Sequence, residues 1–122
     1  MEIAILALMA NELRCLGVNY EYREYTKKLA YPYCVGELSE DDYSYENGNT
    51  ATTFFLTAFS RNDVDLIEMK QLVKKHFADF RRRVGADGTV WISYSNSLFL
   101  ESAVESIAKM EIYLEIKYWE SE

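Results

Sequence analysis

Residue types that often carry chemistry are scarce in this sequence. Its 122 residues include one histidine, one proline, two cysteines and five glycines. The glycines occur singly, which excludes a glycine-rich phosphate loop. Cys15 and Cys34 stand in no metal-ligand or redox spacing, so we expect two buried, unpaired thiols. A dyad built on His76 would need a nucleophile brought beside it by the fold, and no local motif indicates one. We expect His76 to be a helix surface or boundary residue.

A long apolar run is also absent. The stretch "IAILALMA" near the N-terminus is about half of the roughly 20 residues that cross a bilayer. No basic residue precedes it, and Asn11, Glu12 and Arg14 follow closely. We therefore expect a buried helix, and neither a signal peptide nor a membrane span.

Positive charge is in the minority. Thirteen lysines and arginines stand against twenty acidic residues, which gives a net charge of −7. Such a surface repels a phosphate backbone and suits a basic or mixed-charge partner, so sequence-independent DNA binding by the whole surface is not expected. Hydrophobic residues make up 49% of the chain, which suits one domain spanning residues 1–122.

Two segments have helical periodicity. In the first, residues 3–16, the apolar positions recur at helical spacing and Gly17 follows where a left-handed residue ends a helix. The positions expected on its buried face are Ile3, Leu6, Ala10 and Leu13. The second predicted helix begins after a cap at Ser60, Asn62 or Asp63 and is ended by Gly85. Its apolar positions step by three or four, at Leu66, Met69, Val73, Phe77, Phe80 and Val84.

Four other segments have the composition or alternation of strands, namely residues 33–38, 51–60, 89–95 and 109–119. Residues 19–30 suit either a short edge strand or an extended loop, and residues 97–108 either a helical turn or an arm. Pro32 cannot donate to a ladder, which places it at a strand's start. The order predicts an α+β fold, with a mostly antiparallel four- to five-stranded sheet and two helices packed on one face.

Three groups of residues are candidates for a site. The last strand should turn one aromatic and charged face away from the core, and this face, which includes Tyr113 and Trp119, indicates a partner. An acidic segment with the turn dipeptide Asn47-Gly48 should form the tip of a hairpin. Its carboxylates are Glu40, Asp41, Asp42 and Glu46, whose spacing is not that of a calcium-binding EF-hand loop.

The third candidate is the basic run Arg81, Arg82 and Arg83. It suits a solvated helix end that complements the helix dipole, or a patch that meets the acidic segment of a neighbouring copy. Nucleic-acid contact is less favoured, because no aromatic residues are interleaved with the arginines in the sequence. No paired carboxylates are marked as buried, so we expect no enzymatic activity, no cofactor and no metal site.

The succession of blocks resembles the tail terminator, or tail completion, proteins of long-tailed bacteriophages and of prophages. The blocks are "YPYCVGELSEDD", "TTFFLTAFSRND", "LIEMKQLVKKHF", "GTVWISYSNS" and "IYLEIKYWE", and together they span about residues 31–120. None of them is a catalytic motif. The order and spacing of the blocks carry the resemblance.

The resemblance implies a structural virion protein at the junction of head and tail, assembled in the cytoplasm of the bacterial host. Copies would close a hexameric ring on the head-proximal end of the tail tube, stop its polymerisation and join it to the head connector. The subunit could be a monomer until the tube templates it. DNA would pass through the acidic lumen without specific binding.

Two alternatives are kept open. A head-to-tail stopper or connector protein could share this size and acidity. Outside virions, a small ligand-binding regulatory domain would use the aromatic sheet face as a pocket, with convergent polar groups and a dimeric state.

Overall fold

A computed structural model describes residues 2–22, 31–39, 43–44, 50–84, 88–102 and 106–120. Its two helices are α1, Glu2–Cys15, and α2, Asp63–His76. Its strands are β1 (Tyr20–Tyr22), β2 (Tyr33–Leu38), β3 (Tyr43–Ser44), β4 (Thr50–Ser60), β5 (Phe80–Val84), β6 (Gly88–Leu100) and β7 (Ala108–Glu120).

The strands form one sheet in the order β1-β2-β4-β7-β6-β5, and β3 pairs with β4 off this path. β1 runs parallel to β2, and every other pairing is antiparallel. The α+β class is confirmed, but the described strands number seven in a mixed sheet rather than four or five. β1 is the short edge strand that was one of the two alternatives for residues 19–30, and β3 and β5 are short strands that were not predicted.

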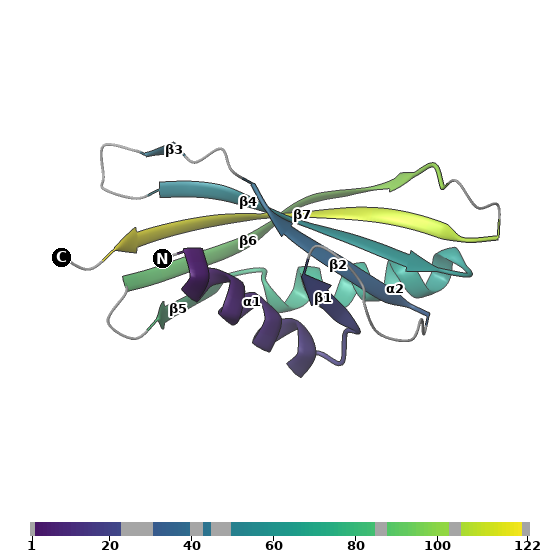
Figure 1. The fold of residues 1–122 in the computed structure, drawn as a ribbon, viewed down its shortest axis with the longest axis horizontal. Coiled ribbons are helices and arrows are strands. Elements are labelled where there is room, and N and C mark those ends of the chain that lie inside the picture. Colours follow the sequence, from purple (N-terminus) through teal and green to yellow (C-terminus); the bar gives the residue numbers. More distant parts are fainter. Residues whose placement is uncertain are drawn as a thin grey trace.

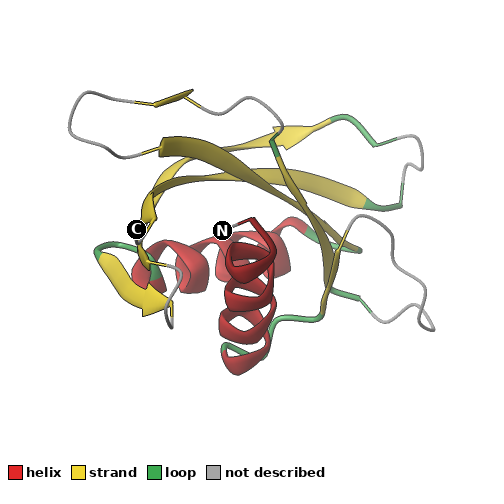
Figure 2. Cartoon of the chain, turned by 60° about the vertical axis from the view of Figure 1, so that its left-hand side comes forward, coloured by secondary structure: helices red, strands yellow, loops and turns green. Residues whose placement is uncertain are grey.

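Both helices lie on the same side of the sheet, which curls over them (Figure 2). One core cluster joins the inward residues of α1 and α2 to those of β4, β6 and β7. Its largest fully buried side chains include Phe54, Phe77, Ile92 and Leu114. The expectation of two helices on one face therefore agrees with the structure, and the opposite face of the sheet is left for other contacts.

Helix α1 buries Leu13 as expected, but the rest of its fully buried stripe differs from the expected positions. Ile5, Met9 and Leu13, spaced by four, are fully buried, whereas Ile3 is 85% exposed. The segment is apolar almost all round, so its sequence alone does not decide which side faces the sheet. After the helix, Gly17 has φ +81°, which is the expected left-handed conformation.

Helix α2 begins as predicted and ends earlier than predicted. The side chain of Asn62 accepts a hydrogen bond of 2.9 Å from the backbone N–H of Asp65, so Asn62 is the cap. The helix ends at His76, with Phe77 as its C-terminal cap. Its predicted extension to Val84 is wrong, because residues 80–84 form strand β5 against β6.

Strands β6 and β7 form a long hairpin. β6 continues to Leu100, so the segment predicted to be a helical turn or an arm is in its first part a strand. A register shift lies between Tyr94 and Asn96. Beyond it, Leu98 and Phe99 are 39% and 48% exposed, so this end of the hairpin presents apolar side chains to solvent.

The two cysteines differ in environment. Cys34 is buried on β2, as expected, and Cys15 at the end of α1 is exposed, contrary to expectation; both are free. Burial raises the pKa of the Cys34 thiol. Neither described helix has the length and apolar character needed to span a bilayer.

Candidate functional site

The face of the sheet that points away from the helices, here called the outer face, carries the candidate site. Side chains alternate between the two faces of a strand. On β7 the even-numbered positions from Met110 to Tyr118 are buried in the core. The odd-numbered positions turn outward, and they include Tyr113, Glu115, Lys117 and Trp119. This arrangement of the last strand agrees with the prediction.

Alternation also divides the three arginines of β5. Arg82 pairs with Val90, a core residue, so its side chain turns toward the helices. Arg81 and Arg83 turn to the outer face. The prediction of a single basic cluster at a helix end is therefore wrong, since the run lies on a strand whose period of two separates the middle arginine from its neighbours.

One of the two outward arginines, Arg81, lies against an aromatic side chain. Arg81, Trp91 and Lys117 form one row across β5, β6 and β7. The guanidinium carbon of Arg81 lies 4.4 Å from the Trp91 ring centroid, and Nζ of Lys117 lies 5.3 Å from it. Both distances permit cation–π attraction. Arg83 and Trp119 occupy the next outward row. We call these five residues the basic tryptophan patch; it extends from β5 across β6 to the end of β7 (Figure 1).

The ion pairs of this patch are weak. Nε of Arg81 is 3.5 Å from Asp79, and Nζ of Lys117 is 3.5 Å from Glu115. Solvent reaches both pairs, so each contributes less than about 1 kcal/mol. The indole N–H of Trp91 is buried and donates no hydrogen bond within the described ranges. The patch can therefore exchange these contacts for a stronger anionic partner.

A second aromatic group lies elsewhere on the outer face. Tyr33 stacks on Phe59 with ring centroids 5.0 Å apart, and Nζ of Lys109 lies 5.8 Å from the Phe59 centroid. Tyr113 meets the ring of Phe55 edge-on at 5.4 Å. A hydrogen bond to Glu111 raises the pKa of the Tyr113 phenol. The outer face thus combines aromatic rings with charges of both signs along its length.

The inward Arg82 belongs to a charged cluster beneath the sheet. Its Nη2 lies 2.9 Å from Oε1 of Glu12, whose side chain is only 8% exposed. Nε2 of His76 lies 3.9 Å from the other carboxylate oxygen. Glu12 Oε1 and His76 Nε2 make no well-aligned hydrogen bond in the described part of the chain, so the attraction between the charges of Arg82 and Glu12 holds these two side chains together. This charged cluster links α1, the end of α2 and β5. Arg82 therefore makes its contact within the subunit.

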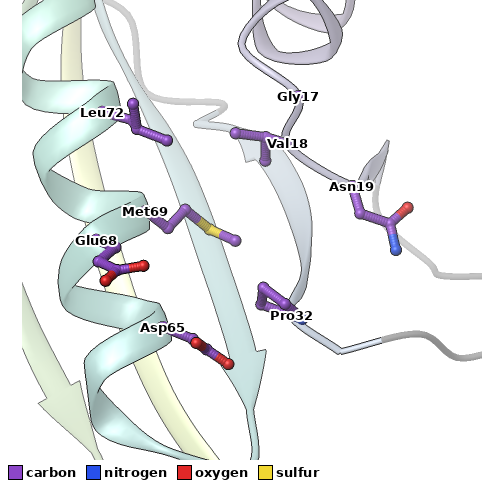
Figure 3. A pocket seen from close by; sticks show the side chains of 8 residues that line it. All are labelled: Gly17, Val18, Asn19, Pro32, Asp65, Glu68, Met69 and Leu72. Carbon is purple, nitrogen blue, oxygen red and sulfur yellow. The ribbon is translucent and has the colours of Figure 1, made fainter.

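A groove lies between α2 and the chain that leads into β1 and β2 (Figure 3). Its volume is about 310 Å³. Met69 and Leu72 of α2 form its apolar side opposite Val18 and Pro32, and acidic side chains lie on the same helix. The lining residues are Gly17, Val18, Asn19, Pro32, Asp65, Glu68, Met69 and Leu72. We call this the α2 groove; nothing in the local sequence pattern predicted it.

The predicted acidic residues Glu40, Asp41, Asp42 and Glu46 lie outside the described residues. The strands that flank them are described: β2 and β4 pair antiparallel, as a hairpin requires, with Tyr33 opposite Phe59. Thr50 of β4, Tyr118 of β7, Val90 of β6 and Arg82 of β5 share one row across the sheet. β4 therefore begins at the same end of the sheet as the arginines.

No group of three or more histidine, cysteine, aspartate or glutamate side chains gathers within the described ranges in a way that could hold a metal ion. The arrangement instead offers surfaces for binding, namely the basic tryptophan patch, the aromatic outer face and the α2 groove.

Comparison of the sequence with models of known protein families, and with curated proteins, found no match.

Proposed function

We propose that this chain is the subunit of a tail terminator ring. Copies would close on the head-proximal end of a phage tail tube, stop its polymerisation and join it to the head connector. The proposal continues from the resemblance of the sequence blocks. Its main structural support is that the strand-forming blocks become β2, β4, β6 and β7, which are neighbours in one sheet. The resembling blocks thus make up a continuous structural unit.

The surface chemistry supports an assembly role. The outer face carries tryptophan, tyrosine and arginine, the residue types enriched in protein interfaces. The charge is segregated, since the patch gathers Arg81, Arg83 and Lys117 in a protein of net charge −7. In a ring with one repeated contact, two different surfaces of the subunit must fit each other. The acidic segment, residues 40–46, remains a predicted contact either with a neighbouring copy or with the tube.

The α2 groove is the observation that favours a second candidate, a small ligand-binding domain. Its volume of 310 Å³ lies at the lower end of the range of small-molecule sites, about 300–1,000 Å³. A ligand that copurifies with the protein and is lost when Met69 is replaced by a larger residue would support this candidate. A stopper or connector role would be supported instead by a ring that binds the portal end and ignores the tube.

The test is the absolute mass of the protein by light scattering, measured alone and with the tail tube protein encoded beside it. A hexamer, or a monomer that becomes a ring on short tubes and halts their growth, is the expected result. Tube growth that is unchanged by a molar excess of this protein, with no co-sedimentation, would refute the terminator function.

A further inference from the structure

We propose that the basic tryptophan patch of one copy docks into the α2 groove of the next copy. The inference rests on the proposed ring and specifies which two surfaces form its repeated contact. Both surfaces consist of described residues, so the contact can be defined by named side chains on each side.

The two surfaces lie at different ends of the subunit. Helix α2 runs from the groove toward β5, and the patch begins on that strand (Figure 1). The 14 residues of α2 span about 21 Å at 1.5 Å per residue. Contact between distinct surfaces at opposite ends is heterologous, so each subunit keeps one surface available for the next. Such contacts build a closed ring when the rotation permits closure.

The two surfaces are complementary in charge. Glu68 is an exposed side chain of the groove, and Asp65 adds a second carboxylate beside it. Asp65 already accepts hydrogen bonds from the side chains of Ser60 and Asn62, so it is held in place and Glu68 is the adaptable partner. On the patch, Arg81 and Arg83 are exposed cations. Arg81 is paired within its own subunit with the exposed Asp79 and lies over the ring of Trp91.

The surfaces also suit each other in shape and polarity. A cavity of about 150 Å³ is enough to hold a benzene molecule, so a groove of 310 Å³ has room for one indole ring. Leu72 at the mouth of the groove is 49% exposed. Met69 is buried at its base, and its flexible side chain can adjust to a bound ring. Trp119, in the same outward row as Arg83, is the anchor that we assign to this groove. Aromatic side chains beside arginine are typical of the residues that dominate binding energy.

A second copy is a better occupant of the patch than nucleic acid. Arginine and tryptophan side chains could also bind single-stranded nucleic acid by stacking. Glu115, however, lies beside Lys117 at the margin of the patch, and the protein as a whole is acidic, so a polyanion would meet repulsion around the patch. An acidic groove on another copy supplies the same negative charge locally, together with apolar surface.

The experiment uses three variants of the full chain: Arg81→Glu with Arg83→Glu, Glu68→Lys, and the combination of all three. Glu101→Lys, at an exposed position outside both surfaces, is the charge-matched control for Glu68→Lys. Self-association is measured by sedimentation over a range of concentrations, with and without short tubes of the tail tube protein. Circular dichroism checks that each variant is folded.

The patch variant and the groove variant should each lose ring formation, with association weakened at least about tenfold, since close charge pairs across an interface couple strongly. An equimolar mixture of the two should recover rings of alternating variants, because the unaltered patch meets the unaltered groove at one contact and the reversed patch meets the reversed groove at the next. The triple variant, with both charges reversed, should recover association. The control should behave as the unaltered protein.

The alternative outcomes overturn the inference in distinguishable ways. Rings that form equally well in all variants would refute this contact and leave the terminator function standing. Rescue of the patch variant by reversing the charges of residues 40–46, and not by Glu68→Lys, would assign the acidic segment as the occupant. Loss of binding to a thymidine oligonucleotide in the patch variant, with rings intact, would assign nucleic acid. Failure of the unaltered protein to associate, with or without tubes, would refute both the contact and the ring.

Discussion

Arg82→Ala should destabilise the fold far more than the same change at either neighbouring arginine. The substitution removes the cation that lies 2.9 Å from Glu12 and leaves a carboxylate that is 8% exposed beneath the sheet. Removal of one partner from a fully buried ion pair costs about 3–5 kcal/mol, and an exposed pair contributes about 0–1 kcal/mol. Arg82 is itself 49% exposed, so we expect an intermediate loss of about 2 kcal/mol.

The measurement is unfolding by urea and by heat. For a domain of this size, a loss of about 2 kcal/mol corresponds to a fall in Tm of roughly 8 °C. Arg83→Ala is the matched control, because it removes the same side chain one residue further on, from the outer face, and should change stability by less than about 0.5 kcal/mol.

The double variant Glu12→Leu with Arg82→Ala tests the cause. Once the carboxylate is gone, no charge is left buried, and apolar replacement of a buried pair is often neutral. We therefore expect the double variant to recover at least half of the stability lost by Arg82→Ala alone. Equal losses in Arg82→Ala and Arg83→Ala, or a double variant that is simply additive, would refute the reasoning.

Three further predictions concern single positions. A Cβ at Gly36 would overlap the ring of Phe54, so Gly36→Ala should lower the free energy of unfolding by about 2 kcal/mol. If urea unfolding shows a loss below about 0.5 kcal/mol, which is typical of a surface substitution, the close packing is contradicted. Burial raises the pKa of the Cys34 thiol in the folded state above its value in the unfolded chain. The stability that the buried neutral thiol contributes is therefore fully present below about pH 8.5. Above that pH, the free energy of unfolding falls by up to about 1.4 kcal/mol per pH unit. Urea unfolding between pH 8 and pH 10 should show a shallower decline in Cys34→Ala, and identical slopes would show that the thiol is not responsible. Asn62→Ala removes the cap of α2 and should lower stability by about 1 kcal/mol in thermal unfolding, whereas Asn62→Gly should lose only a few tenths; equal losses would argue against the capping bond.

The long strands could be predicted because each carries its own pattern. β7 alternates from Met110 to Tyr118, with one face buried and the other partly exposed, and this period of two is unambiguous over so many residues. The polar segment between β2 and β4 similarly indicated an antiparallel hairpin, and their pairing confirms it. Local patterning therefore predicts the strands at the centre of the sheet.

Strand β5 was mistaken for helix because its sequence satisfies both periods. Phe80 and Val84 are four apart, which continues the helical stripe of α2, and they also lie on one face of a strand. The residue between them on that face is Arg82, whose charge hides the strand pattern. Its partner Glu12 comes from the other end of the chain, so no local pattern could show that an inward arginine is satisfied there.

The candidate site was only partly visible for the same reason. Tyr113 and Trp119 follow from the alternation of β7, but the aromatic partner of Arg81 is Trp91 on another strand. The sequence thus showed arginines without interleaved aromatic residues, whereas the sheet brings the two types side by side. Such proximity depends on strand register, which residue spacing does not reveal.

The position of β7 in the sheet has a consequence for how the protein is made. β7 lies between β4 and β6, although it is the last strand in the chain. Both neighbours therefore expose long unpaired edges until β7 has left the ribosome, and the pairing of β4 with β7 joins residues far apart in sequence. Folding through such non-local pairs is slow, and open edges favour aggregation. Early termination within β7 should thus yield insoluble chains rather than a smaller folded domain.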